Sequence, residues 1–210
     1  RYLQSPYGKF ETYYVLGVRP GYDPHIRLGF QRLESAAEWR RIVLEQDLAA
    51  MDACFDPVPV QPGEVWTVPG GLPHAIGAGL TVIEVMEPTD LVVRCEFVRE
   101  GIEVPPPARF MNGDPEFALR IFDTTPLSVG EVTRRYRVTP QVLVESAEYT
   151  LARMIGPQHT ACFETQKLDV RAPCTVPLDG RFAAMIVLGG EGEMRCGKET
   201  VEIRRGSRFF

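Results

Sequence analysis

Short runs rich in aromatic and β-branched residues recur along this chain, and several alternate apolar with polar positions. Runs of this kind, bounded by turn residues, are typical of β-strands. In the first half they predict strands at Phe10–Val18, His25–Phe30, Val65–Val68 and Leu80–Met86. Strands return after Gln141, and in the final piece we expect them at Met185–Leu188, Glu193–Cys196 and Val201–Arg204. The pattern therefore predicts a mainly β protein.

One long segment of the first half has a helical spacing instead. Ser35 and Glu38 form the sequence pattern of a capping box, which starts a helix. Two apolar stripes follow at helical spacing, and the step at Gln46–Asp47 divides them into two short helices: Trp39, Ile42 and Val43, then Leu48, Met51 and Phe55. We expect residues 35–56 to be a helical insertion that covers the outside of the β-structure.

A second helical region separates the two β-rich halves. The prolines of Val104–Pro107 cannot continue a strand ladder and mark a boundary. Asp114–Phe122 is weakly helical, and Ser128 with Glu131 predicts a further capped helix. These patterns predict a first β unit over 1–104, a helical spacer over 105–140 and a second β unit over 141–210.

Composition and charge narrow the class of protein. The 210 residues are 44% hydrophobic and 24% charged, with a net charge of -5, as in ordinary soluble domains. This charge argues against partners such as nucleic acid or an anionic membrane, and no apolar run is long enough to span a bilayer. The odd number of cysteines favours free thiols, small buried hydrophobes in a reducing cytoplasm: Cys54, Cys95, Cys162, Cys174 and Cys196. Because the sequence starts at Arg1 and stops inside an expected strand, we expect a longer polypeptide.

The candidate chemistry is concentrated in Gln61–Phe97, around His74. A single histidine is most simply a hydrogen-bonded core residue. Here, however, Gly63 is followed after five residues by Pro-Gly-Gly and, two residues later, by His74. This spacing resembles the second sequence motif of the cupin family, with Ala78 in place of its closing asparagine. His25 and His159 have no partner ligand at useful spacing, and we interpret both as structural.

Glu11 stands among apolar neighbours at the start of the first predicted strand. It is either an exposed strand-end acid or a buried one, and a buried carboxylate needs a paired group or a bound cation. Lys9, two residues earlier, points to the same side if the strand already runs there. It is equally well an ordinary solvated lysine.

Three segments, in order, give a closer resemblance. GKFETYYVL is similar to a Gly-Lys-Thr-Glu-(Met/Ser)-Trp-Tyr motif, PGEVWTVPGGLPHAIGAG to a Pro-Gly-Asp…His-Ala-Ile-Gly motif, and VIEVMEPTDLVVR to a Leu-Glu-x-x-x-x-Ser-Asp-x-x-x-Arg motif. All three belong to the class I mannose-6-phosphate isomerases, zinc enzymes built from two cupin barrels. The resemblance implies a bicupin, or jelly-roll β-barrel, fold with a catalytic first cupin and a second cupin without metal.

The same resemblance implies roles for particular residues. Glu11 and His74 correspond to ligands of one Zn²⁺, although another divalent metal would suit them, and the family's other two ligands, in a Gln-Val-His-Pro segment, are expected upstream of Arg1. Three further residues correspond to catalytic groups that face the sugar phosphate: Lys9, Asp90 and Arg94. Glu84 corresponds to a buried acid that helps to bind the substrate, and it is equally well a core carboxylate paired with a strand neighbour.

The implied reaction interconverts mannose 6-phosphate and fructose 6-phosphate through an enediol, in a cytoplasmic monomer or homodimer. Which of Lys9, Asp90 and Glu84 moves the proton stays open. Three alternatives also stay open: an isomerase for another sugar phosphate, a non-catalytic cupin that binds a sugar phosphate, and an iron dioxygenase. The last would need two histidines and one carboxylate on the metal.

Overall fold

A computed structural model describes residues 9–177, 180 and 182–210 of the chain, so the Gly8 that opens the first motif lies outside it. The described residues are mainly β and group into two compact units. The first comprises residues 1–146 and 150–169, and the second residues 147–149 and 170–210. The mainly β prediction is confirmed.

The first unit contains a four-stranded sheet in the order β6-β1-β4-β9. Its strands are β1 (Glu11–Val18), β4 (Val65–Val68), β6 (Leu80–Met86) and β9 (Arg137–Val138). β1 runs antiparallel to both neighbours, so that Tyr13 lies opposite Trp66 on β4 and Glu84 on β6. Because side chains alternate between faces, these three residues and Glu11 share one face of the sheet.

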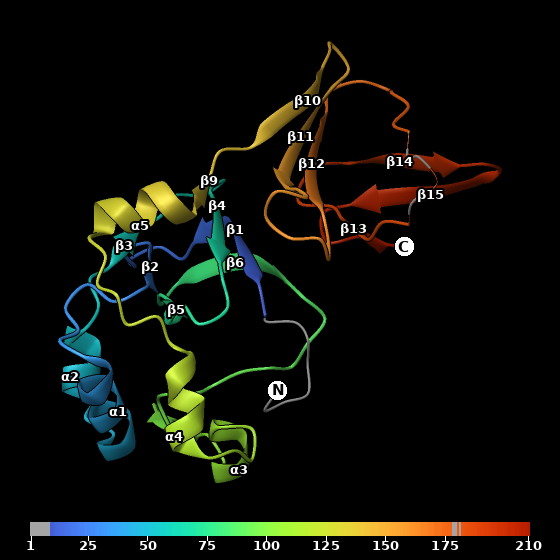
Figure 1. Ribbon diagram of the computed structural model, residues 1–210. Helices are drawn as coiled ribbons and strands as arrows, with labels where there is room; N and C mark the ends of the chain where they lie inside the picture. Colours follow the sequence, from blue (N-terminus) through green and yellow to red (C-terminus); the bar gives the residue numbers. More distant parts are fainter. Residues whose placement is uncertain (1–8, 178–179, 181) are drawn as a thin grey trace. The chain divides into compact units, whose positions relative to one another are not determined.

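A three-stranded sheet, β3-β2-β5, packs against that face (Figure 1). It consists of β2 (His25–Leu28), β3 (Val58–Pro59) and β5 (His74–Ile76). A single apolar cluster includes side chains from both sheets, among them Tyr13, Trp66, Leu28 and Val58. This arrangement of two facing sheets leaves the first residues of β1 and of β5 beside the apolar core.

The predicted helical insertion is confirmed as α1 (Ala36–Glu45) and α2 (Leu48–Ala53). The chain breaks between them at Gln46, whose φ of 54° is left-handed and ends α1. Ser35 caps α1 by accepting the Glu38 amide, but Glu38 binds Arg41 instead of completing the capping box. Trp39, Ile42 and Val43 are buried, as their spacing predicts, and pack in a second apolar cluster with Phe30.

The segment after β6 is irregular and carries only short elements. They are β7 (Val98–Arg99), β8 (Ile102–Glu103), α3 (Pro106–Arg109), α4 (Pro115–Ala118), a 3-10 turn η1 (Leu119–Ile121) and α5 (Val129–Tyr136). At α5 the capping box of Ser128 and Glu131 is complete. Val132 of α5 is fully buried and joins the core between the two sheets.

A further sheet, β10-β11-β12, lies almost wholly in the first unit. Its strands are β10 (Gln141–Glu145), β11 (Tyr149–Ile155) and β12 (Thr165–Val170). Met154 and Ile155 of β11 pack on Val65, the outward-facing neighbour of Trp66 on β4. The sheet thus covers the outer face of β1 and β4.

The second unit is built from two hairpin-like pairs. β13 (Met185–Ile186) pairs with β16 (Arg208–Phe209), and β14 (Glu191–Cys196) with β15 (Glu199–Arg204). These strands agree with those expected near residue 185 and beyond. The compact units divide the chain elsewhere than the sequence domains do, and the assignment of residues 141–210 to a second cupin stays a prediction.

All five cysteines are free, as their odd number predicts. The expectation that they are buried is wrong for three of them, because Cys162, Cys174 and Cys196 are exposed. Only Cys54 is buried, and Cys95 is half-buried. Among the described residues, no helix has both the length and the apolar character needed to cross a membrane.

Candidate functional site

At the start of β1, a buried acid lies beside a lysine and a histidine. Glu11 is the first residue of the strand and is only 6% exposed. Its Oε1 lies 3.2 Å from Lys9 Nζ, and its Oε2 lies 3.3 Å from His74 Nε2. The sequence alternatives for Glu11 are thereby decided, since the carboxylate is buried and paired.

The turn before β5 brings His74 to this acid. Gly71 has a φ of +83°, and a Cβ there would lie 2.5 Å from the Ile121 carbonyl oxygen, so the turn requires glycine. His74 then pairs with Leu28 across β5 and β2, which directs its ring to the inner face. The packing of the two sheets therefore joins residues that are 63 positions apart in sequence.

One hydrogen bond fixes the state of the His74 ring. Its Nδ1 lies 2.8 Å from the Leu72 carbonyl oxygen, which can only accept, so Nδ1 carries a hydrogen. In the neutral ring, Nε2 is then an acceptor directed at the Glu11 carboxylate, which is also an acceptor. Two acceptors 3.3 Å apart need a proton or a cation between them.

The protonation equilibria follow from these contacts. Burial by itself raises the pKa of Glu11, but hydrogen bonding and attraction from His74 and Lys9 outweigh burial and lower that pKa from 4.5 to about 2. Burial lowers the pKa of His74, whereas hydrogen bonds to Glu11 and the Leu72 carbonyl raise it more, to a value above the usual 6.5. Each shift in pKa favours the charged form of its group, the carboxylate of Glu11 and the imidazolium of His74.

Tyr13 is a member of the cluster that the sequence analysis did not single out. Its side chain is 2% exposed, and its hydroxyl donates to Glu11 Oε2 at 3.4 Å. Its ring lies edge-on to the His74 imidazole, with 6.3 Å between centroids. The spacing of two residues from Glu11 along one strand is the signal that could have identified it.

Glu84 corrects one expectation. It lies opposite Tyr13 on β6, on the same face as Glu11, but it is exposed rather than the buried acid expected from the sequence. Partial burial and the negative charge of Glu11 raise its pKa above 4.5. Glu84 therefore joins the cluster as a second, more readily protonated carboxyl group.

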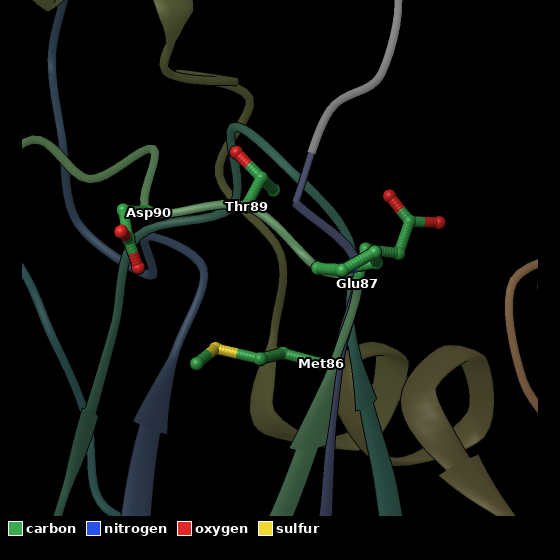
Figure 2. Close-up of a pocket in the computed structure, with 5 residues that line it drawn as sticks. Met86, Glu87, Thr89 and Asp90 are labelled. Atoms are coloured by element: carbon green, nitrogen blue, oxygen red, sulfur yellow. The ribbon is translucent and has the colours of Figure 1, made fainter.

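Asp90 and Arg94 lie on the irregular segment that follows β6. Asp90 helps to line an open hollow of ≈ 250 Å³ formed by Met86–Asp90. Figure 2 shows the carboxylates of Glu87 and Asp90 pointing away from one another across this segment. Arg94 donates from its guanidinium to the Ala108 carbonyl oxygen at 2.8 Å. The contacts of the structure join Lys9, Glu11 and His74, while Arg94 is bound to the α3 helix.

The remaining two histidines have structural contacts, as expected. His25 begins β2, and its Nδ1 lies 2.9 Å from the Asp23 carbonyl oxygen. His159 accepts the Gly156 amide on its Nδ1 at 3.2 Å. Each ring thus fixes the backbone of its own turn.

The cluster offers part of a metal site. A carboxylate oxygen and a neutral imidazole nitrogen are ordinary ligands of Zn²⁺, and a backbone carbonyl on Nδ1 is the usual support for such a histidine. The facing acceptors of Glu11 and His74 fit a cation. Within residues 9–177, 180 and 182–210, however, no three His, Cys, Asp or Glu side chains form a metal-binding group.

The fold is of the cupin type found in phosphomannose isomerases. The structure matches mannose 6-phosphate isomerase from Bacillus subtilis with a TM-score of 0.70 over 95% of this chain and 57% of that one, at 16% identity. It matches a point mutant of phosphomannose isomerase from Salmonella typhimurium with a TM-score of 0.59 over 99% and 64% of the two chains, at 14% identity.

A mannose 6-phosphate isomerase bound with zinc and yttrium gives a TM-score of 0.60, at 14% identity over 99% of this chain and 62% of that one. In sequence, the chain is 24% identical to a mannose-6-phosphate isomerase from Streptococcus mutans over 97% of its own length. It covers 58% of that relative. No family model matches the chain.

Proposed function

We propose that this chain is part of a metal-dependent aldose–ketose isomerase that interconverts mannose 6-phosphate and fructose 6-phosphate. The observation that supports the proposal is the approach of Glu11 and His74, 3.3 Å apart, beside Lys9. The similarity to mannose-6-phosphate isomerases of other organisms agrees with it. The chain spans little more than half of those relatives, so the proposal concerns the whole protein to which it belongs.

Glu11 Oε2 and His74 Nε2 are the atoms proposed to hold the metal. Zn²⁺ bound there would polarise the sugar carbonyl and favour negative charge on its oxygen. The Leu72 carbonyl keeps the Nε2 lone pair of His74 directed at the site. The Tyr13 hydroxyl holds Glu11 Oε2 from within the core. The other ligands are expected from the Gln-x-His segment predicted upstream of Arg1.

The isomerisation moves a proton between C1 and C2 of the sugar, through an enediol. Lys9 and Glu84 flank Glu11, and each is a candidate to carry that proton. The raised pKa of Glu84 suits proton exchange near neutral pH better than an ordinary carboxylate does. Asp90 is the third candidate, at the hollow next to β6.

Arg94 is proposed to bind the phosphate group. Its planar guanidinium can offer paired donors to phosphate oxygens. In the structure it is exposed and gives one hydrogen bond to Ala108, so further donor hydrogens are available to a ligand. A phosphate at Arg94 would leave the sugar end of the substrate to the Glu11 cluster.

The test is a coupled assay of mannose 6-phosphate isomerisation by the intact gene product, before and after treatment with a chelator. We expect turnover that the chelator removes and added Zn²⁺ restores. Turnover insensitive to the chelator, or none with this substrate, would contradict the proposal. A panel of other sugar phosphates separates a different isomerase from a binding protein. Metal analysis that finds iron would favour the dioxygenase alternative.

A further inference from the structure

Glu87 and Thr160 form a partly buried contact next to the candidate site, and none of the proposed chemistry uses it. Glu87 follows the last residue of β6, and Thr160 lies in the connection between β11 and β12. Thr160 is 8% exposed, and its hydroxyl donates to Glu87 Oε1 at 2.8 Å. A buried hydroxyl on a carboxylate is a strong hydrogen bond, because one partner is charged.

The other carboxylate oxygen of Glu87 binds the backbone of Phe10. Glu87 Oε2 accepts the Phe10 amide at 3.3 Å, and the Glu87 amide donates to the Phe10 carbonyl oxygen at 2.9 Å. The backbone carbonyl of Glu87, which would accept the Phe10 amide in a regular ladder, accepts the Thr89 amide at 2.7 Å instead. The side chain therefore replaces a main-chain acceptor at the point where the β1–β6 ladder ends.

Phe10 stands between two residues of the candidate site, Lys9 and Glu11. Its ring also contacts Phe163, 6.5 Å away between centroids. The Thr160 hydroxyl also accepts the Cys162 amide at 3.1 Å, and this hydrogen bond fixes the connection between β11 and β12. Three separate segments of the first unit thus meet at the backbone of residue 10.

We propose that Glu87 and Thr160 are positioning residues, which hold the backbone at Phe10 so that Lys9 and Glu11 keep their places beside His74. This inference rests on the proposed function for its catalytic consequence, but not for its structural part. Glu87 acts on the peptide groups of Phe10, and Thr160 in turn acts on Glu87. Neither residue therefore needs to touch a substrate. Displacement of a reacting group by a fraction of an ångström lowers turnover more than it weakens substrate binding.

The test compares Thr160→Val, which removes the hydroxyl at nearly constant shape, with Thr160→Ser, which retains it. Glu87→Ala removes the acceptor. Thr67→Val is the matched control, because Thr67 is also buried but its hydroxyl donates to the Tyr136 carbonyl. All are made in the intact gene product, and three quantities are measured: hydrogen exchange of the Phe10 amide, Zn²⁺ affinity, and kcat and KM for mannose 6-phosphate.

For Thr160→Val and Glu87→Ala we expect about tenfold faster exchange at Phe10, since that amide loses its fixed acceptor. We expect about tenfold weaker Zn²⁺ binding, as for loss of other groups that support metal ligands. kcat should fall by about tenfold with little change in KM. Thr160→Ser and Thr67→Val should resemble the wild type in all three.

Each outcome decides the inference. Unchanged exchange at Phe10 in Glu87→Ala overturns the proposed clamp, that is, the hold of Glu87 and Thr160 on the backbone of Phe10. Faster exchange with unchanged Zn²⁺ affinity and kcat overturns its role in positioning. The same losses in Thr160→Ser or Thr67→Val would show a general effect on folding, and would also overturn it. If the wild type turns over no mannose 6-phosphate, the proposed function fails, while the exchange and Zn²⁺ measurements still test the clamp.

Discussion

The candidate residues on strands and those on the irregular segment behave differently. Glu11 and His74 are far apart in sequence and lie in different sheets, yet the packing of these two sheets brings their side chains to 3.3 Å. Asp90 and Arg94 are four residues apart on a segment without regular structure. Asp90 lines an open hollow, and Arg94 is hydrogen-bonded to Ala108 of α3. Sequence proximity is therefore a poor guide to which residues of this site meet.

The two regions differ because different contacts fix their backbones. β1 pairs with a strand on each side, and β5 pairs with β2. A slip of one residue in either register would turn every side chain of the strand to the other face. The segment after β6 has fewer such constraints, since its turns are held by isolated hydrogen bonds such as Leu91 N to Thr89 Oγ1. We therefore expect the strand-borne pair to be placed rigidly, and the segment to adjust when a ligand binds.

The largest expected effect is that of Glu11→Gln, which keeps the shape of the side chain and removes its charge. We expect Zn²⁺ binding to be lost and kcat/KM of the intact protein to fall by about a thousandfold, the equivalent of several kcal/mol of charge stabilisation. Steady-state kinetics and calorimetric metal titration measure both. Glu64→Gln is the control, because Glu64 binds Arg137 and the Trp66 indole instead. Equal losses of Zn²⁺ binding and kcat/KM in both variants would contradict a specific role of Glu11 in binding the metal.

Trp66→Ala tests whether the apolar core sets the strand register. Trp66 is fully buried opposite Tyr13, and its loss should lower the free energy of unfolding by about 3–5 kcal/mol. Denaturant unfolding measures the change. Ile102→Ala, on the irregular segment, is the comparison: that side chain is 75% exposed, and we expect a change within about 0.5 kcal/mol. Similar costs at both positions would contradict the contrast between the two regions.

The strand-borne pair also predicts how the stability of the metal-free protein depends on pH. The pKa of Glu11 is lowered from 4.5 to about 2, so its stabilisation is present above pH 4.5 and is lost as pH falls toward 2. The pKa of His74 is raised above 6.5, so its stabilisation is present below pH 6.5 and is lost as pH rises through the raised value. The pair thus contributes most between these two limits.

The free energy of unfolding of the wild type and of Glu11→Gln, measured across pH 2 to 9, checks this expectation. Each unit by which folding shifts a pKa changes that free energy by about 1.4 kcal/mol. The difference in unfolding free energy between the two proteins should be largest near pH 5 to 6 and shrink on either side. A difference that stays constant with pH would mean that Glu11 and His74 do not interact as ions.

The smallest expected effect is that of Arg94→Lys, on the irregular segment. Lysine retains the charge but loses the paired donors, so we expect KM for the sugar phosphate to rise by about tenfold with kcat nearly unchanged. The comparison is sharpened by Arg99→Lys, since Arg99 is bound to Glu96 away from the hollow and should show no change. A fall in kcat without a change in KM would place Arg94 with the strand-borne group instead.

The sequence by itself located most of the regular elements and, through the family resemblance, proposed Glu11 and His74 as site residues. Alternation and β-branched residues located β1, β4 and β6, and helical spacing located α1 and α2. Motif spacing singled out His74, and the resemblance of GKFETYYVL to the isomerase family singled out Glu11. These signals are local, because each depends on the order of a few neighbouring residues. The division of the helical insertion at Gln46 could also be read there.

Only the tertiary structure decided which groups meet. The hydroxyl of Tyr13 on Glu11, the exposure of Glu84 and the attachment of Thr160 to Glu87 depend on how sheets pack and how connections return. A sequence records which side of a strand a residue occupies, but burial and partnership depend on segments distant along the chain. For that reason the local patterns could select the acid and the imidazole, whereas the environment that sets their charges required the folded molecule.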